Sequence, residues 1–162
     1  MGGDRKILDK VLGHALSGTG AHVETAAVFA ALDWKLAAIR PEKAPHSVYQ
    51  LLNHTLYWQE WVVRWVGGEN PQIPKHAAGS WPGDPGPASR KEWEQAVRRF
   101  RDGLKVLTRR SRDADLFSKG HTTSRLEMLQ TIASHNSYHA GQVVLLRQVL
   151  GTWPPPSGGL TW

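Results

Sequence analysis

Apolar residues recur at helical spacing in four long segments of the chain, and this periodicity predicts a helical protein. Three of the segments begin with a serine that is followed three residues later by Gln or Glu, which is the form of a capping box. In such a box, the serine side chain and the third helical residue satisfy each other's backbone N–H groups. The four predicted main helices span about 4–16, 47–66, 89–112 and 124–150.

The connections between these segments complete the expected fold. Two short helices are predicted after the first main one, over Thr25–Leu32 and from a cap at Asp33 to Arg40. The segment Glu69–Ala88 is rich in Pro, Gly and Trp and is too irregular for helix or strand, and loops of this length often cover something. No alternating strand pattern stands out. We therefore expect an all-α fold, a four-helix bundle with long crossover loops, in one domain over 1–162.

Composition narrows the classes of protein that fit this pattern. The chain has no cysteine, which excludes disulfides, thiolate metal sites and cysteine nucleophiles. No apolar stretch approaches the roughly 20 residues of a membrane helix, so no membrane partner is expected. The N-terminus lacks the apolar stretch of a secretory signal, which makes a cytoplasmic location the default.

The formal charge of +6 is concentrated in one predicted helix. Ser89–Asp113 carries nine basic and four acidic residues, which is most of the excess. A basic helix can meet nucleic acid or acidic substrates, but it is more often a solvated face. Because no recognition motif accompanies the charge and acids are interspersed, nucleic acid is not expected as a partner.

Two of the eight histidines stand four residues apart on the last predicted helix. Since each helical residue turns about 100°, His135 lies about 40° from His139, and both fall within the apolar stripe of Ile132, Val143 and Leu146. Two imidazoles at this spacing can coordinate one metal ion, because their side chains are neighbours on the helix surface. Metal binding, catalysis, a pH switch and no function at all are the alternatives for this pair.

A third histidine, His54, lies at the border of the core stripe of its own helix, in line with Trp58, Trp61 and Trp65. Three imidazoles facing the bundle interior would form a site that leaves positions open for water or substrate. The remaining histidines are expected to be solvated or capping residues at helix ends and in loops: His14, His22, His46, His76 and His121. Of these, His46 lies just before the helix that carries His54, so it is the most interesting of the five as a residue near the expected site.

Four stretches of the chain form a recognisable set: "PHSVYQLLNHTLYWQEWV", "SWPGDP", "HNSYHAGQVVLLRQVLGTWPPP" and the tail "SGGLTW". Together these motifs resemble the DinB-like (DinB/YfiT) superfamily of bacterial metal-binding four-helix proteins. The H-x-x-x-H-x-G-Q core with an upstream helical histidine is fairly specific. The resemblance implies that His54, His135 and His139 form a metal triad, and it implies a divalent ion, most often zinc or nickel, with iron, manganese and copper as further candidates.

The resemblance also implies a chemistry. Characterised enzymes of the family are metal-dependent transferases or isomerases that use low-molecular-weight thiols such as bacillithiol or mycothiol. Other members are grouped as stress- or damage-inducible proteins, so a non-catalytic metal-binding protein is the alternative. The expected partners are therefore a small-molecule electrophile and a thiol. Hydrolysis by a metal-activated water molecule is a second possible reaction. Homodimers are frequent in the family, which makes a second copy of the chain a further expected partner.

Side chains near the expected triad are candidates for a substrate pocket. Trp58, Trp61 and the loop containing Trp81 can wall it, and Gln142 or Tyr138 can serve as polar guides, with core packing or exposure as the alternative for each. Tyr138 points about 100° away from His139 on the helix, which counts against a direct role. Because an ordinary imidazole has a pKa near 6.5, metal affinity is expected to fall below about pH 6.

Overall fold

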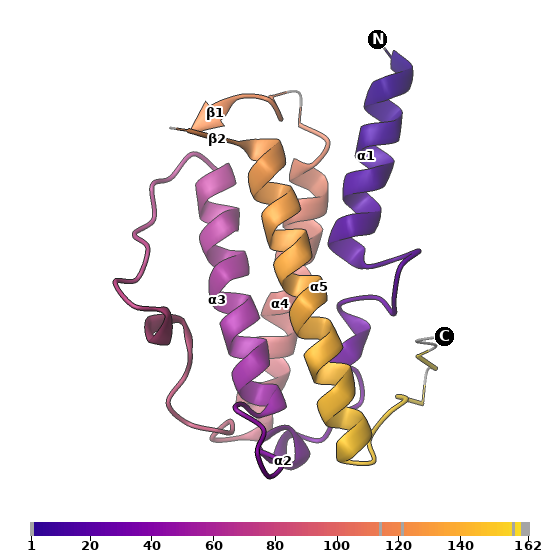
Figure 1. The fold of residues 1–162 in the computed structure, drawn as a ribbon, viewed down its shortest axis with the longest axis vertical. Helices are drawn as coiled ribbons and strands as arrows, with labels where there is room; N and C mark the ends of the chain where they lie inside the picture. Colours follow the sequence, from indigo (N-terminus) through magenta and orange to yellow (C-terminus); the bar gives the residue numbers. More distant parts are fainter. Residues whose placement is uncertain (1, 114, 121, 157, 160–162) are drawn as a thin grey trace.

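Four long helices pack side by side in a computed structural model that describes residues 2–113, 115–120, 122–156 and 158–159 (Figure 1). The predicted all-α four-helix bundle is confirmed. No helix in this described part of the chain has both the length and the apolar character needed to cross a membrane. The long helices are α1 (Gly2–Ser17), α3 (Val48–Val66), α4 (Arg90–Arg110) and α5 (Arg125–Val149).

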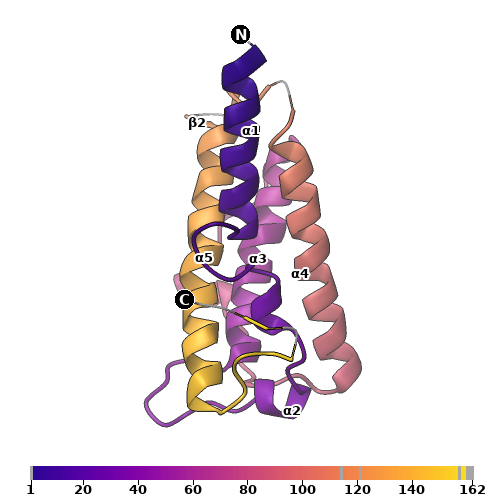
Figure 2. The same cartoon turned by 90° about the vertical axis from the view of Figure 1, so that its right-hand side faces the viewer.

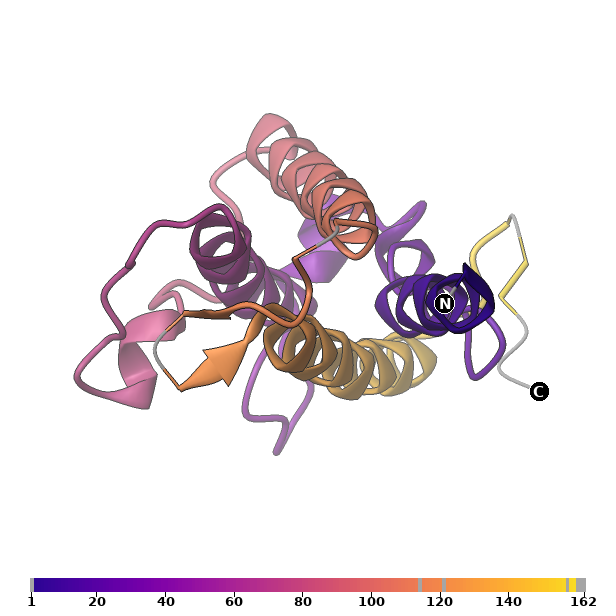
Figure 3. The ribbon, with the colours of Figure 1, turned by 90° about the horizontal axis from the view of Figure 1, so that it is seen from above.

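The order of the helices around the bundle differs from their order in the chain. α3 packs against α4 and α5, and α1 packs against the same two helices from the opposite side (Figures 2 and 3). α3 and α4 run in the same direction, and α1 and α5 run in the other (Figure 1). Because α3 and α4 are parallel neighbours, the chain between them must return along the length of the bundle, which is why residues 67–89 form a long crossover.

The short elements correct several details of the sequence-based expectation. The predicted helix over Thr25–Leu32 is only a single 3₁₀ turn, and the helix capped by Asp33 is one turn long instead of reaching Arg40. The Glu69–Ala88 segment also contains a 3₁₀ turn, and a pair of two-residue antiparallel strands precedes α5. The short elements are η1 (Ala27–Phe29), α2 (Trp34–Ala37), η2 (Ala77–Ser80), β1 (Lys119–Gly120) and β2 (Thr123–Ser124).

Two of the three predicted capping boxes are complete. The hydroxyl oxygens of Ser47 and Ser124 each accept a hydrogen bond from the N–H of the third helical residue, and the serine N–H groups donate to the side chain of that residue. Ser89 accepts from the N–H of Glu92, but the Glu92 carboxylate accepts instead from the Ala88 N–H and the Tyr49 hydroxyl. The start of α4 is therefore tied to α3, while the starts of the two histidine-bearing helices are fixed locally.

The buried apolar side chains form two clusters, one toward each end of the bundle. Along α5, the first cluster includes Ala140, Val143 and Val144, and the second ends at Ala133. Asn136 and His139 lie between them and are buried, as is Gln59 on α3. A layer of polar side chains thus separates the two apolar clusters, and buried polar groups of this kind need partners.

A buried arginine fixes the lower end of α5. Arg147 is 1% exposed and donates hydrogen bonds to the carbonyls of Val28, Ala30 and Thr152. Its guanidinium also lies over the Trp153 ring, 5.2 Å from the centroid. These bonds hold η1 and the segment after α5 against the helix that carries two of the candidate ligands.

Candidate metal centre

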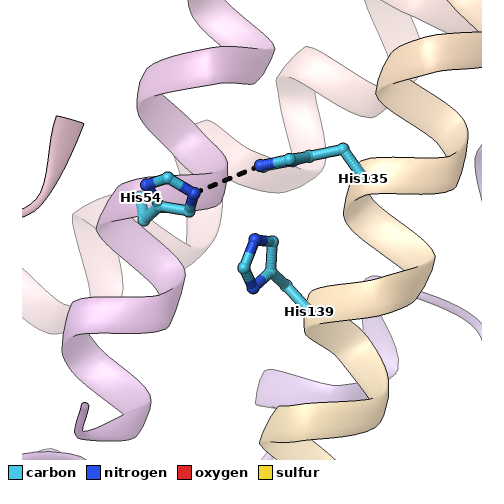
Figure 4. Close-up of side chains that lie close together, drawn as sticks. All are labelled: His54, His135 and His139. Carbon is cyan, nitrogen blue, oxygen red and sulfur yellow. Dashed lines mark hydrogen bonds between the residues drawn. The ribbon is translucent and has the colours of Figure 1, made fainter. Parts of the chain in front are cut away.

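The structure brings His54, His135 and His139 together between α3 and α5. One potential ligand atom from each ring lies within 4.8 Å of the other two, and the rings point toward one another (Figure 4). His54 is 8% exposed and His139 is 6% exposed, while His135 is partly buried. Among the described residues, no aspartate or glutamate joins this cluster, so imidazole nitrogens are its only donors.

Each ring has an oxygen atom facing its Nδ1. The Nδ1 of His54 is 3.3 Å from the Ser80 carbonyl and 3.1 Å from the Ser80 hydroxyl. The hydroxyl donates to the Ala77 carbonyl, so it accepts from His54. Nδ1 of His139 is 2.7 Å from the Gln142 side-chain oxygen. The contact between His135 Nδ1 and the Asn136 side-chain oxygen is longer, at 3.5 Å.

These Nδ1 contacts determine whether the Nε2 atom of each ring carries a hydrogen or a free lone pair. An Nδ1 that donates its hydrogen leaves Nε2 with a lone pair, and oxygen partners on Nδ1 are the usual arrangement around a metal-binding histidine. The Nε2 atoms of His54 and His135 are 3.2 Å apart. Two ligands at zinc–nitrogen distances of about 2.0–2.1 Å in tetrahedral geometry would be separated by about 3.4 Å. The lone pairs of two Nε2 atoms at this distance repel each other, whereas a cation between them attracts both. The arrangement of these nitrogen donors therefore fits a bound metal ion.

The side of the cluster that faces the bundle interior is held by a buried amide chain. Asn136, which contacts His135, donates from its amide to the Gln59 side-chain oxygen at 3.2 Å. Gln59 is fully buried and donates in turn to the Phe100 carbonyl on α4 at 2.8 Å. Three helices are therefore connected through hydrogen bonds directly beside the cluster, which fixes its position in the polar layer.

Burial keeps the three rings neutral. It is the main reason that the pKa of His54 is lowered to about 4, with the nearby charges of His139 and His135 adding to the effect. The pKa of His135 is lowered to about 4 by burial first and by His139 second. Burial also lowers the pKa of His139. The expected loss of metal affinity below about pH 6 is therefore corrected, because protons compete for these nitrogens only at lower pH.

The crossover loop supplies an aromatic cover over His54. The Trp81 ring stacks on the His54 ring with centroids 3.8 Å apart, and the His46 ring stacks on the other face of Trp81 at 3.7 Å. Burial, followed by the charge of Arg40, lowers the pKa of His46. The sequence marked the Trp81 loop as a possible wall, but it gave no sign that His46 forms the outer layer of this stack.

The remaining pocket candidates lie in different places. Gln142 contacts the cluster through His139. Trp58 packs edge-on against Trp61 and borders the second apolar cluster, and the Trp61 indole donates to the carbonyls of the crossover loop. Tyr138 is 66% exposed, with its ring edge-on to His139 at 5.1 Å.

Sequence reasoning missed the polar residues that support the imidazoles. Ser80, Asn136 and Gln59 are all buried and all bond to the cluster or to each other. The one sequence signal for Asn136 and Gln59 is an amide side chain on a helix face that is otherwise apolar. His22, expected to be solvated or capping, is 2.9 Å from the Ser137 hydroxyl. His121 lies outside the described residues.

Comparison with known proteins agrees with this arrangement. Searches of curated proteins and of solved structures return no match to the chain. A sequence model of the DinB superfamily matches residues 19–143, which include α3, α4 and the part of α5 that carries the two histidines. With a match over most of its length and a helical bundle that holds three converging histidines, the chain belongs to the DinB superfamily.

Proposed function

We propose that this protein binds one divalent transition-metal ion through the Nε2 atoms of His54, His135 and His139. The observation that carries the proposal is the 3.2 Å approach of two Nε2 atoms whose rings have oxygen partners at Nδ1. Neutral imidazoles suit zinc, nickel, copper and iron better than manganese, which prefers oxygen ligands. Zinc or nickel is the ion we expect.

We further propose that the centre activates a thiol for transfer to an electrophile, or a water molecule for hydrolysis. Three protein ligands leave positions open for a small molecule, and a bound divalent ion supplies Lewis acidity that lowers the pKa of a thiol or of water. The chain has no cysteine, so the thiol is a separate low-molecular-weight molecule of the bacillithiol or mycothiol type.

The chain's own residues hold and shield the reacting groups. Gln142 fixes the orientation of the His139 ring, and Ser80 does the same for His54. Trp81 covers one face of His54 and keeps water from that side. A site with fixed donors and restricted water is suited to a step in which charge develops on sulfur or oxygen.

One observation favours a second function. The candidate ligands come from two helices that begin far apart in the chain, and two of the three rings are almost fully buried. An ion in this position would join α3 to α5 and stabilise the bundle whether or not any reaction took place. A metal-binding stress protein without turnover is therefore the alternative.

Elemental analysis of purified protein tests the ligand set. We expect about one transition-metal ion per chain in the wild type and almost none in His135→Ala. His76→Ala is the matched control, because His76 is exposed on the crossover loop, and it should keep the full metal content. A His135→Ala protein that still carries a full equivalent of metal would show that the triad is wrong.

Thiol consumption separates the two functions. The metal-loaded wild type is incubated with a panel of bacterial thiols and small electrophiles, with His135→Ala as the blank. Consumption that requires both metal and His135 supports the transferase. If the metal-loaded protein consumes no thiol and releases no hydrolysis product with any member of the panel, the non-catalytic function is favoured.

We also propose that the partners of this protein are small molecules and a second copy of the chain. The small-molecule proposal rests on the thiol and the electrophile of the reaction above, and the homodimer rests on the frequency of dimers in the superfamily. Light scattering of the purified protein tests the dimer directly. A mass equal to one chain at micromolar concentration would rule it out.

A further inference from the structure

A groove lined by two tryptophans lies between the end of α3, the start of α5 and the crossover loop. Trp61 stands seven residues after His54 on α3, and Met128 stands seven residues before His135 on the antiparallel α5. Seven helical residues rise about 10 Å and return to nearly the same face. Both residues are therefore displaced by about 10 Å along the helix axes from the histidines, in one direction and on nearly the same helix faces.

The tryptophan groove, as we call it, has a volume of about 450 Å³ and is lined by Trp61, Trp65, Ile73 and Met128 together with the uncharged residues 70–72 and 122–123. This volume is within the range of sites for small molecules. Ile73 is 65% exposed at its edge. Its side chain is therefore accessible to a ligand that enters the groove.

The walls of the groove are held in place by hydrogen bonds. The Trp61 indole N–H lies 3.1 Å from the carbonyls of both Pro71 and Gln72, which fixes the crossover loop against α3. On the other side, Thr123 belongs to the two-residue strand pair that leads into the capped start of α5. The groove is therefore formed before a ligand arrives, which lowers the entropic cost of binding.

The charge of the lining identifies the class of ligand. No charged side chain is among the described residues that line the groove, although the chain is rich in charge. An adjoining cavity of about 200 Å³ shares Trp65 and Asn70 with the groove, and Glu69, Lys119 and Arg125 lie there instead. Another cavity, of about 690 Å³ between η1 and α4, is lined by three arginines and two acids. Of these three cavities, only the tryptophan groove has a lining without charged side chains.

We infer that the tryptophan groove binds the uncharged, aromatic or branched aliphatic part of the electrophilic substrate. In this assignment the reactive group of that substrate reaches the histidine triad, about 10 Å along the helix axes from the groove and past Trp58. This assignment rests on the proposed function for the identity of the reaction. It adds the substrate class, which is an elongated neutral molecule with an apolar body.

A neutral fluorescent probe tests the groove itself. N-phenyl-1-naphthylamine is titrated into the metal-free and the metal-loaded protein, and the rise in its fluorescence reports the affinity. We expect binding in both forms and an affinity about tenfold lower in Ile73→Asp, because the new carboxylate would be desolvated by the probe. Ile39→Asp is the matched control, since Ile39 is also exposed, at 43%, and lies outside the groove.

Paramagnetic relaxation tests the position of the groove relative to the metal. In protein loaded with Co²⁺, the probe protons should relax faster than in protein loaded with Zn²⁺, by an amount that fits a separation of about 10 Å. In His135→Ala the enhancement should disappear while the affinity for the probe remains. Probe binding that is equal in Ile73→Asp and wild type, or binding without enhancement in the Co²⁺ protein, would overturn the inference.

The two proposals fail in different ways. A protein that takes up no metal but still binds the probe in a manner that depends on Ile73 would refute the proposed function and retain the groove as an apolar site. A protein that takes up metal through His135 but has no affinity for the probe would retain the metal centre and refute the groove.

Discussion

The acid–base behaviour of His54 and His135 follows from their burial. Each has a pKa of about 4 in the folded protein, against about 6.5 in an unfolded chain. Because the folded value is the lower one, the unfolded chain binds more protons between these two pH values. The stability contributed by the neutral rings is complete above pH 6.5 and is lost as the pH falls toward 4.

We therefore expect acid to destabilise the metal-free protein through these two residues. The loss for the pair is on the order of a few kcal/mol. Urea unfolding at pH 7 and pH 4.5 measures it, with the double variant His54→Gln, His135→Gln as the comparison. Carboxylates titrate in both proteins, so a smaller acid effect in the variant isolates the imidazoles. Equal effects in the two proteins would contradict the prediction.

The hydrogen bond between Gln142 and His139 should contribute to metal affinity. Gln142→Ala removes the oxygen that faces Nδ1 of His139, so the ring loses its preferred tautomer and orientation. Losses of this kind reduce metal affinity about 10- to 100-fold. Competition with a chromophoric chelator measures the affinity. Gln148→Ala is the matched control, because Gln148 is an exposed amide on the same helix, and this variant should bind metal like the wild type. Unchanged metal affinity in Gln142→Ala would show that the contact between Gln142 and His139 does not support metal binding.

The candidate ligands were accessible from sequence because helix geometry places them. Rotation about the axis turned His135 and His139 inward, and the structure has them facing His54. The stack of His46 on Trp81 was not accessible, since both residues lie in irregular segments that have no period from which a direction can be calculated. The same holds for Ser80, whose contact with His54 depends on how the crossover loop returns along the bundle.

At the scale of the helices, a glycine controls how closely α4 approaches α3. A Cβ at Gly103 would lie 2.2 Å from the Gln59 side-chain nitrogen and 3.1 Å from its amide carbon. Gln59 is fully buried and bonded at both ends of its amide, to Phe100 and to Asn136. Moving its amide would break these buried hydrogen bonds, so the close packing of the two helices depends on the missing side chain at position 103.

Gly103→Ala is expected to destabilise the protein by about 1–3 kcal/mol, because the added methyl group must break the Gln59 bonds or separate the helices. Helix propensity alone predicts the opposite sign, a gain of up to about 1 kcal/mol. Gly141→Ala is the matched control, since Gly141 lies on the exposed side of α5 with nothing near its Cβ position. It should be neutral or stabilising. Urea unfolding of both variants checks the signs, and a stable Gly103→Ala would show that the helices adjust freely.

Across the whole molecule, periodicity predicted the number and extent of the long helices but not their arrangement. The starts at Ser47 and Ser124 follow from local hydrogen bonds, so the sequence located them. The parallel packing of α3 and α4 depends on a crossover of more than twenty residues, and a connection of that length permits either direction. Long connections leave topology to the packing of distant side chains, which a pattern of apolar residues does not specify.

The stability of the bundle as a whole should depend only partly on metal. Its two apolar clusters lie on either side of the polar layer, and each includes side chains from α3, α4 and α5. The packing within each cluster does not pass through the histidines. The helices should therefore remain folded when the ion is removed, unlike a small zinc domain in which the metal replaces a core.

We expect a strong chelator to lower the Tm by roughly 5–15 °C, since a tightly bound ion at excess stabilises the native state by a few kcal/mol. The far-ultraviolet circular dichroism at 25 °C should remain that of a helical protein, and thiol consumption, if the protein catalyses it, should stop and return when zinc or nickel is restored. His135→Ala should show no change in Tm with chelator. A loss of helical signal on chelation would instead make the ion an essential part of the fold, because the two clusters could then not hold α3 and α5 together by themselves.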